Sequence, residues 1–164
     1  PGIETKKIIS YLPERNALDD SKKVMGAVNF MRDFYEDFDK PKAIELLKRL
    51  SIDPDKKLKS LSKGTKEKVQ LILMMSRNAK LFLLDEPIGG VDPAARDFIL
   101  DTIIKNYNKD ATVVISTHLI ADVESVLDEF VFIRNGEILQ HSQVADVEKT
   151  GKTVDTLFRE VFKC

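Results

Sequence analysis

The chain has 164 residues, about the size of one domain, of which 43% are hydrophobic and 32% are charged. This composition is too apolar for a disordered chain and is typical of a globular protein. Lysine and arginine number 26 against 27 acidic residues, so the net charge of −1 gives no basic field that would favour nucleic acid as a partner. The single cysteine excludes a disulfide within the chain, and no apolar run reaches the ~18 residues of a membrane span.

The first half of the chain predicts one strand followed by helices. Residues 7–12 are rich in β-formers and end at Pro13, which predicts a strand that runs into a loop. Residues 16–78 show helical, amphipathic spacing. One helix is expected to begin near Pro41, a favourable first helical residue, and another near Ser62.

The second half alternates strands and helices. Residues 81–84 are continuously apolar, which predicts a strand buried on both faces of a parallel sheet, and residues 112–116 predict a second buried strand. Helices are expected over residues 93–108 and 120–127. Asn135-Gly136 then predicts a β-hairpin turn. The fold class is therefore α/β with a mostly parallel sheet and an inserted helical subdomain.

We expect the chain to form a single domain over residues 1–164. Its core would contain residues 1–15 and 79–142. Residues 16–78 would form the helical subdomain, and residues 143–164 a helical tail.

Two adjacent carboxylates, Asp85 and Glu86, end the most apolar strand. Ligands of open α/β sheets bind beyond the carboxyl ends of the strands, and two adjacent acids repel unless a cation or a polarised water lies between them. The pattern favours Asp85 as a Mg²⁺ ligand and Glu86 as the general base on an attacking water. The alternative is that Asp85 caps a loop and Glu86 is solvated.

Three further segments supply candidate site residues. Ser62 and Gly64 open a predicted helix, whose free amides and dipole favour an anion. His118 follows the strand at residues 112–116 and is expected at the same sheet edge, although a lone histidine there is more often a surface residue. A flexible turn with an acidic cap is expected at Gly89, Gly90, Val91 and Asp92. On its own, this pattern indicates only a loop.

Together, the order and spacing of these segments resemble the nucleotide-binding subunit of ATP-binding-cassette (ABC) transporters, a family with a P-loop NTPase core. Residues 61–65 resemble its signature motif, and residues 81–86 resemble its Walker B strand with the catalytic glutamate. Residues 89–92 resemble its D-loop and residues 116–118 its switch histidine. Residues 11–14 fall at its Q-loop.

The resemblance implies a role for each matching residue. Asp85 would support Mg²⁺, with Glu14 as a second candidate ligand, and Glu86 would polarise the attacking water. His118 would contact the γ-phosphate of ATP. Asp92 would couple two subunits.

The resemblance also implies partners and a location. The family works as head-to-tail homo- or heterodimers with ATP between the subunits, so Ser62 and Gly64 would contact nucleotide held by a second nucleotide-binding subunit. Residues 15–38 are the candidate contact with a transmembrane permease subunit at the cytoplasmic face of the cell membrane. The cofactors implied are ATP and Mg²⁺, and no nucleic acid partner is expected.

The sequence departs from the family pattern at three places. Glu14 stands where the family usually has glutamine, and Lys63 and Thr65 replace the commoner glycine and glutamine of the signature. The chain contains no G-x-x-x-x-G-K-[ST] phosphate loop, which in the family precedes the Q-loop. We therefore expect the C-terminal two-thirds of a subunit, inactive alone and unable to bind ATP tightly. The strand at residues 112–116 would then lack one neighbouring strand.

Two other interpretations remain open. The same cassette occurs in soluble ATPases that act on ribosomes or nucleic acid, although their paired cassettes and basic arms are not seen here. A chain that only mediates contacts, without activity of its own, is the second alternative. The sequence does not identify the transported substrate or the direction of transport.

Overall fold

The computed structural model describes residues 2–91 and 93–162, and it divides the chain into two compact units. Unit 1 is Pro1–Thr117 and unit 2 is His118–Cys164. The boundary falls inside the range 79–142 that the sequence analysis places in one core. The assignment of residues 118–142 to the ATPase core stays a prediction.

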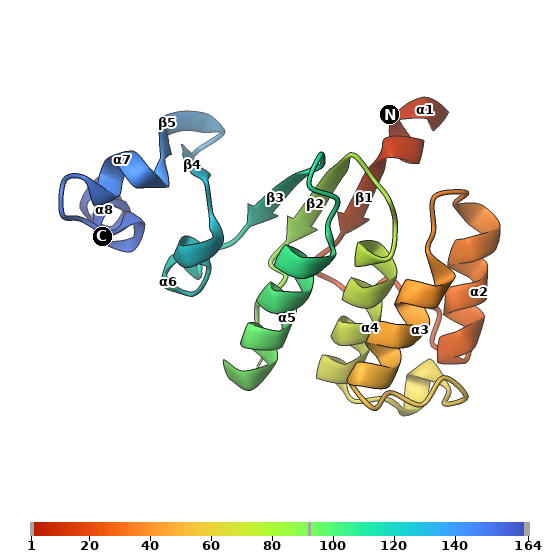
Figure 1. Ribbon diagram of the computed structural model, residues 1–164. Coiled ribbons are helices and arrows are strands. Elements are labelled where there is room, and N and C mark those ends of the chain that lie inside the picture. The colour runs from red at the N-terminus through yellow and green to blue at the C-terminus, as the bar shows by residue number, and fades with distance from the viewer. Residues whose placement is uncertain (1, 92, 163–164) are drawn as a thin grey trace. The chain divides into compact units, whose positions relative to one another are not determined.

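Unit 1 begins with a short helix and contains a small sheet with a layer of helices (Figure 1). Its elements are α1 (Ile3–Ile8), β1 (Ile9–Leu12), α2 (Val24–Phe34), α3 (Lys40–Arg49), the 3₁₀-helix η1 (Leu58–Ser60), α4 (Lys63–Met75), β2 (Leu81–Asp85), α5 (Pro93–Asn106) and β3 (Thr112–Ser116). The predicted strand at residues 7–12 is thus shorter than expected. Its first two residues end α1, where Lys7 pairs with Glu4 across one helical turn at 3.0 Å.

The sheet of unit 1 is parallel, with the strand order β1-β2-β3. Its register places Leu12 beside Leu84 and Asp85 beside Ser116. The carboxyl ends of all three strands therefore meet at one edge of the sheet, as the candidate site requires.

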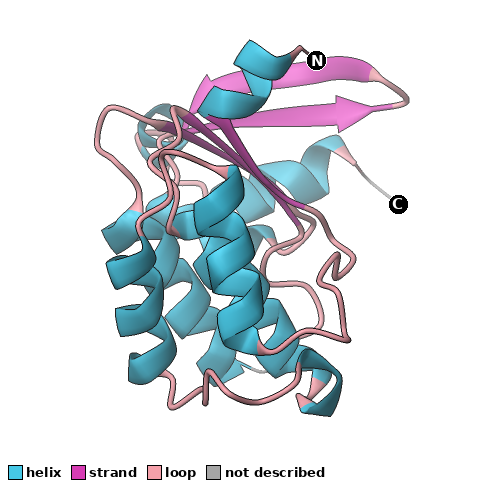
Figure 2. Cartoon of the chain, turned by 90° about the vertical axis from the view of Figure 1, so that its right-hand side faces the viewer, coloured by secondary structure: helices cyan, strands magenta, loops and turns pink. Residues whose placement is uncertain are grey.

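Strand β2 is not buried on both faces, which corrects the sequence prediction. Phe82 and Leu84 are buried, whereas Leu81 and Leu83 on the opposite face are half-buried. In unit 1 the helices α2, α3, α4 and α5 lie on one side of the sheet, so only that face is fully covered (Figures 1 and 2).

Strand β3 is an edge strand among the described residues. It pairs with β2 alone, which agrees with the expectation that it lacks one neighbour. The predicted burial of residues 112–116 is wrong: Thr112, Val114 and Ser116 are exposed. A strand with one partner and one covered face buries only part of its apolar surface.

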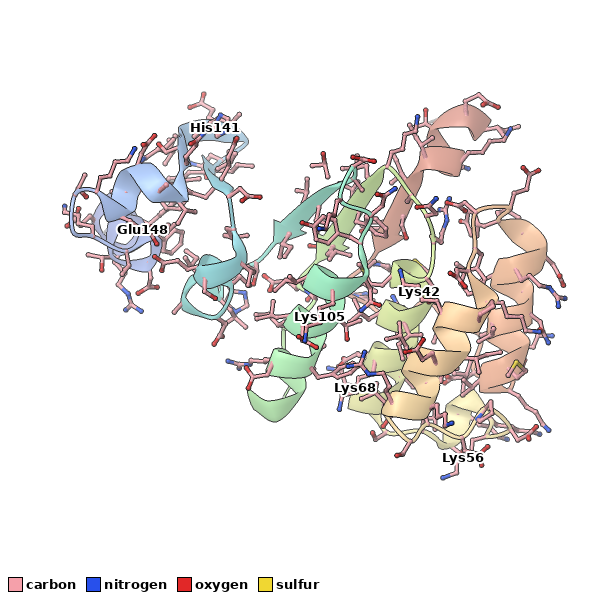
Figure 3. All side chains as sticks on the ribbon, in the orientation of Figure 1. Lys42, Lys56, Lys68, Lys105, His141 and Glu148 are labelled. Atoms are coloured by element: carbon pink, nitrogen blue, oxygen red, sulfur yellow. The ribbon has the colours of Figure 1, made fainter. Side chains whose placement is uncertain are left out.

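The helical layer has its own apolar core. Asp39 caps α3, because its Oδ1 accepts from the N–H of Lys42 at 2.9 Å, and Pro41 lies in the first turn as predicted. α2, α3 and α4 bury their apolar faces against one another, with the core residues Val24, Val28, Ala43, Leu46, Leu47, Leu58, Val69 and Ile72. Lys42, which is labelled in Figure 3, also donates to the carbonyl of Asn106 at the end of α5. Burial lowers the pKa of Lys42.

Arg77, which follows α4, joins the helical layer to the start of the sheet. Its Nε and Nη2 donate to the two carboxylate oxygens of Asp37 at 3.0 and 3.1 Å. Its Nη1 donates to the carbonyl of Ile9 at 2.5 Å, and Nη2 also donates to that of Lys7 at 2.7 Å. The guanidinium lies over the ring of Tyr35, and the side chain is only 2% exposed.

Unit 2 is built on a hairpin and short helices. Its elements are α6 (Ile120–Val123), the 3₁₀-helix η2 (Glu124–Val126), β4 (Glu129–Arg134), β5 (Glu137–Gln143), α7 (Val144–Glu148) and α8 (Val154–Val161). The Asn135-Gly136 turn is confirmed, with both residues at positive φ. Phe130 and Phe132 pack with the tail helices, which confirms the helical character of the tail. None of the described helices in the chain is long and apolar enough to cross a membrane.

We predict that Arg77→Met lowers the free energy of unfolding of unit 1 by about 3–5 kcal/mol, because it leaves a carboxylate and two carbonyls without their buried partner. Urea denaturation of the chain measures this loss. Arg32→Met is the control, since Arg32 is exposed and bonds the neighbouring, exposed Asp33. Its effect is expected within about 0.5 kcal/mol. Equal effects of the two substitutions would contradict the role of Arg77.

Candidate functional site

The two carboxylates predicted for the site, Asp85 and Glu86, lie at a sharp turn of the backbone at the end of β2. Asp85 is the last residue of the strand, and Glu86 has a φ of +46°, in the left-handed region. The N–H of Glu86 donates to the carbonyl of Ser116 at 2.8 Å, so the end of β3 holds this turn. Both acidic side chains are half-buried at the carboxyl edge of the sheet.

Hydroxyl groups from the end of β3 bond both carboxylates. Ser116 Oγ donates to Asp85 Oδ1 at 3.1 Å, and Thr117 Oγ1 donates to Glu86 Oε2 at 3.0 Å. These bonds orient the two half-buried acids. The sequence analysis treats Ser116 and Thr117 only as the residues before His118. The available signal is the pair of hydroxyl residues at the end of the neighbouring strand, of which the parallel register places Ser116 beside Asp85.

Gly89 approaches Glu86 closely. Its N–H donates to the Glu86 carbonyl at 3.0 Å. A Cβ on Gly89 would lie 3.3 Å from that carbonyl oxygen, 3.4 Å from Glu86 Cβ and 3.6 Å from Oε2. Glycine therefore leaves the space that the Glu86 side chain uses. Asp92, the predicted D-loop residue, lies outside the described residues.

The carboxylates at the sheet edge fit a Mg²⁺ ion whose remaining ligands come from water and substrate. The described residues contain no group of three or more His, Cys, Asp or Glu side chains that could hold a metal. Mg²⁺ in nucleotide sites is usually held by one or two carboxylates, with waters and substrate phosphates as further ligands. Asp85 can supply such a carboxylate, and Glu14 is a second candidate in the loop after β1.

The first turn of α4 has the features of an anion site. Ser62 is the N-cap: its Oγ accepts from the N–H of Thr65 at 3.2 Å and lies 2.8 Å from Thr65 Oγ1. A Cβ on Gly64 would meet nothing within 4 Å, so this turn is open to a ligand. Helix α4 has 13 residues and a dipole that favours negative charge at this end.

The structure brings some of the predicted site residues together and separates others. Asp85 and Glu86 share the sheet edge with the strand end before Glu14. Ser62 and Gly64 lie elsewhere, because the first turn of α4 is at the far end of the helical layer from the strand ends (Figure 1). His118 is the first residue of unit 2, and its contact with a γ-phosphate stays a prediction.

Solved structures share this fold. The chain matches a protein described as "Structure of ATP binding subunit of ABC transporter" with a TM-score of 0.85 and 26% identity, over 97% of this chain and 70% of that chain. The parallel sheet, the helical layer and this similarity define the α/β fold of ABC ATPase subunits, a class of P-loop NTPase. The predicted fold class is confirmed.

Sequence comparison gives the same assignment. Residues 6–121 match the family described as "AAA domain, putative AbiEii toxin, Type IV TA system", so the chain belongs to this AAA-domain family. It is 30% identical over 144 residues to the ABC transporter ATP-binding protein YtrB of Bacillus subtilis, covering 84% of this chain and 49% of the relative. It is 29% identical over 150 residues to an uncharacterized ABC transporter ATP-binding protein of Methanocaldococcus jannaschii, covering 88% and 57%. The resemblance to ABC transporter ATP-binding proteins is thereby confirmed, although the chain spans only about half the length of these two relatives.

We predict that Ser62→Ala lowers the free energy of unfolding of unit 1 by about 1 kcal/mol, because an N–H in the first turn of α4 loses its acceptor. Ser62→Asn should restore most of this stability, since asparagine is an equally good N-cap. Urea denaturation of the three proteins tests both statements. A loss of stability that asparagine does not recover would show that the cap is not the cause.

Proposed function

We propose that this chain is the part of an ABC transporter's nucleotide-binding subunit that supplies the catalytic glutamate and the signature motif. The reaction is hydrolysis of ATP by in-line attack of water on the γ-phosphate, coupled to transport through a membrane partner. The observation that carries the proposal is the Asp85–Glu86 pair, fixed at the sheet edge by the hydroxyls of Ser116 and Thr117. The names of the relatives support the ATP-binding part.

Each carboxylate has a distinct role in this proposal. Glu86 accepts a proton from the attacking water, and its hydrogen bond with Thr117 keeps the side chain at the sheet edge. Asp85 holds Mg²⁺, which neutralises charge on the phosphates when it is bound. Glu14 is a second candidate ligand. His118 contacts the γ-phosphate, and Asp92 couples the two subunits.

The partners follow from the same proposal. Ser62 and Gly64 contact ATP held by a second nucleotide-binding subunit, which is supported by the separation of α4's first turn from the strand ends. Residues 15–38 contact a transmembrane permease at the cytoplasmic face of the membrane. Within this range Phe30 and Phe34 stack at 5.8 Å and are 63% and 67% exposed, as expected of an apolar contact surface.

We predict that Glu86→Gln reduces ATP turnover by about 10²–10⁴-fold while ATP binding is kept, because the amide cannot act as a general base. The measurement is steady-state hydrolysis and nucleotide titration with the full-length subunit, meaning this chain with all residues that flank it in its protein. Asp85→Asn is the comparison and should weaken nucleotide binding only when Mg²⁺ is present. Turnover by Glu86→Gln near the wild-type rate would refute the assignment.

The signature residues give a second prediction. Gly64→Asp adds a side chain and a negative charge where the triphosphate of the other subunit would approach. In the full-length subunit it should suppress ATP-driven dimerisation and leave nucleotide binding by the monomer nearly unchanged, as measured by size-exclusion chromatography and titration. Parallel loss of dimerisation and monomer binding would contradict a role in trans.

A further inference from the structure

A buried amide on the signature helix holds the loop that carries Glu14. Gln70 lies on α4 and is 3% exposed. Its Oε1 accepts from the N–H of Ala17 at 3.1 Å, and its Nε2 donates to the carbonyl of Pro13 at 3.4 Å. Because Pro13 and Ala17 bracket Glu14, a single side chain fixes both ends of this loop.

The chemistry of these contacts requires glutamine. Pro13 offers only an acceptor, and Ala17 presents an N–H donor, so the residue between them must both donate and accept. A carboxamide does so, whereas methionine makes neither bond. One turn earlier on α4, Lys66 donates to both carboxylate oxygens of Asp20 at 2.6 and 2.8 Å. The same helix therefore holds the segment after β1 at two points.

The Gln70 bonds set residues 14–17 relative to α4, and Leu18, just beyond them, packs against the core that α4 shares. Residues 14–17 are exposed and form no helix or strand. The contact of the Leu18 N–H with Asn16 Oδ1, at 2.9 Å, is local and shapes the loop without tying it to the helix. Loss of the Gln70 bonds would give the segment around Glu14 more conformational freedom.

We propose that Gln70 is a positioning residue, which holds the Glu14 loop at the carboxyl edge of the sheet where Asp85 and Glu86 lie. The catalytic consequence rests on the proposed function, whereas the contact between Gln70 and the loop is independent of it. Gln70 acts through Glu14 and does not itself touch substrate. Its effect should therefore disappear when the Glu14 carboxylate is removed.

The first experiment measures amide hydrogen exchange in this chain. Gln70→Met is expected to speed exchange of the Ala17 N–H by about tenfold or more, since the amide loses its buried acceptor. The N–H of Val24, which bonds the Lys56 carbonyl at 3.0 Å, is the internal control and should keep its rate. Lys66→Met is the matched variant, because it removes a second polar link between α4 and this segment and should leave Ala17 protected.

A second variant covers the case in which Gln70→Met does not fold. Gln70→Asn keeps a polar amide, but its shorter side chain does not reach both ends of the loop. It should speed Ala17 exchange in the same direction. Unchanged Ala17 exchange in a folded variant would overturn the proposal.

The second experiment is a double-mutant cycle on ATP hydrolysis by the full-length subunit. Gln70→Met is expected to lower kcat and raise the Mg²⁺ concentration needed for half-maximal rate, by about tenfold in the wild-type background and less than about twofold in Glu14→Gln. Equal effects in both backgrounds would refute positioning through Glu14. If the wild-type subunit hydrolyses no ATP, the proposed function fails, and the exchange experiment alone decides the loop contact.

Discussion

The packing of the helical layer of unit 1 against the start of its sheet depends on the buried guanidinium of Arg77. The Arg77 guanidinium presents its donors in a single plane, and four of its hydrogen bonds reach Asp37, Ile9 and Lys7. These partners belong to the segment between α2 and α3, to β1 and to α1. Helix α1, strand β1 and the segment between α2 and α3 therefore all contact the one side chain that follows α4. Since β1 leads into the Glu14 loop and α4 leads into β2, this contact also sets the relative position of two edges of the candidate site.

The sequence predicts the features that depend on neighbouring residues. The helix starts at Pro41 and Ser62, the hairpin at Asn135-Gly136 and the acidic strand end at Asp85 are all local patterns. The residues it missed act across the chain. Thr117 reaches Glu86 over 31 positions, Gln70 reaches Ala17 over 53, and Arg77 reaches Ile9 over 68. In a helix and loop rich in charged residues, a buried arginine or glutamine has no local pattern that separates it from a solvated one.

Burial was the other quantity that the sequence predicted poorly. The apolar run at residues 81–84 and the strand at 112–116 have the composition of fully covered strands, yet each has a partly open face. Composition reports what a strand is able to bury, whereas its actual burial depends on which elements lie against it. In unit 1 the helices α2, α3, α4 and α5 lie on one side of the sheet, so hydrophobicity overestimates the coverage of β2 and β3.

The geometry of Glu86 shows why the edge strand matters for the site. A non-glycine residue at a φ of +46° carries roughly 1–2 kcal/mol of backbone strain, so the turn needs contacts that hold it. The contacts that hold it include the bond from the Glu86 N–H to Ser116, the bond from Gly89 back to Glu86, and the hydroxyl of Thr117 on the carboxylate. The bonds with Ser116 and Thr117 come from the end of β3. A shift of β3 by one residue would turn its side chains to the opposite face and replace both partners. The register of this exposed edge strand therefore fixes the direction of the proposed general base, so a strand that contributes little to the core is central to the proposed chemistry.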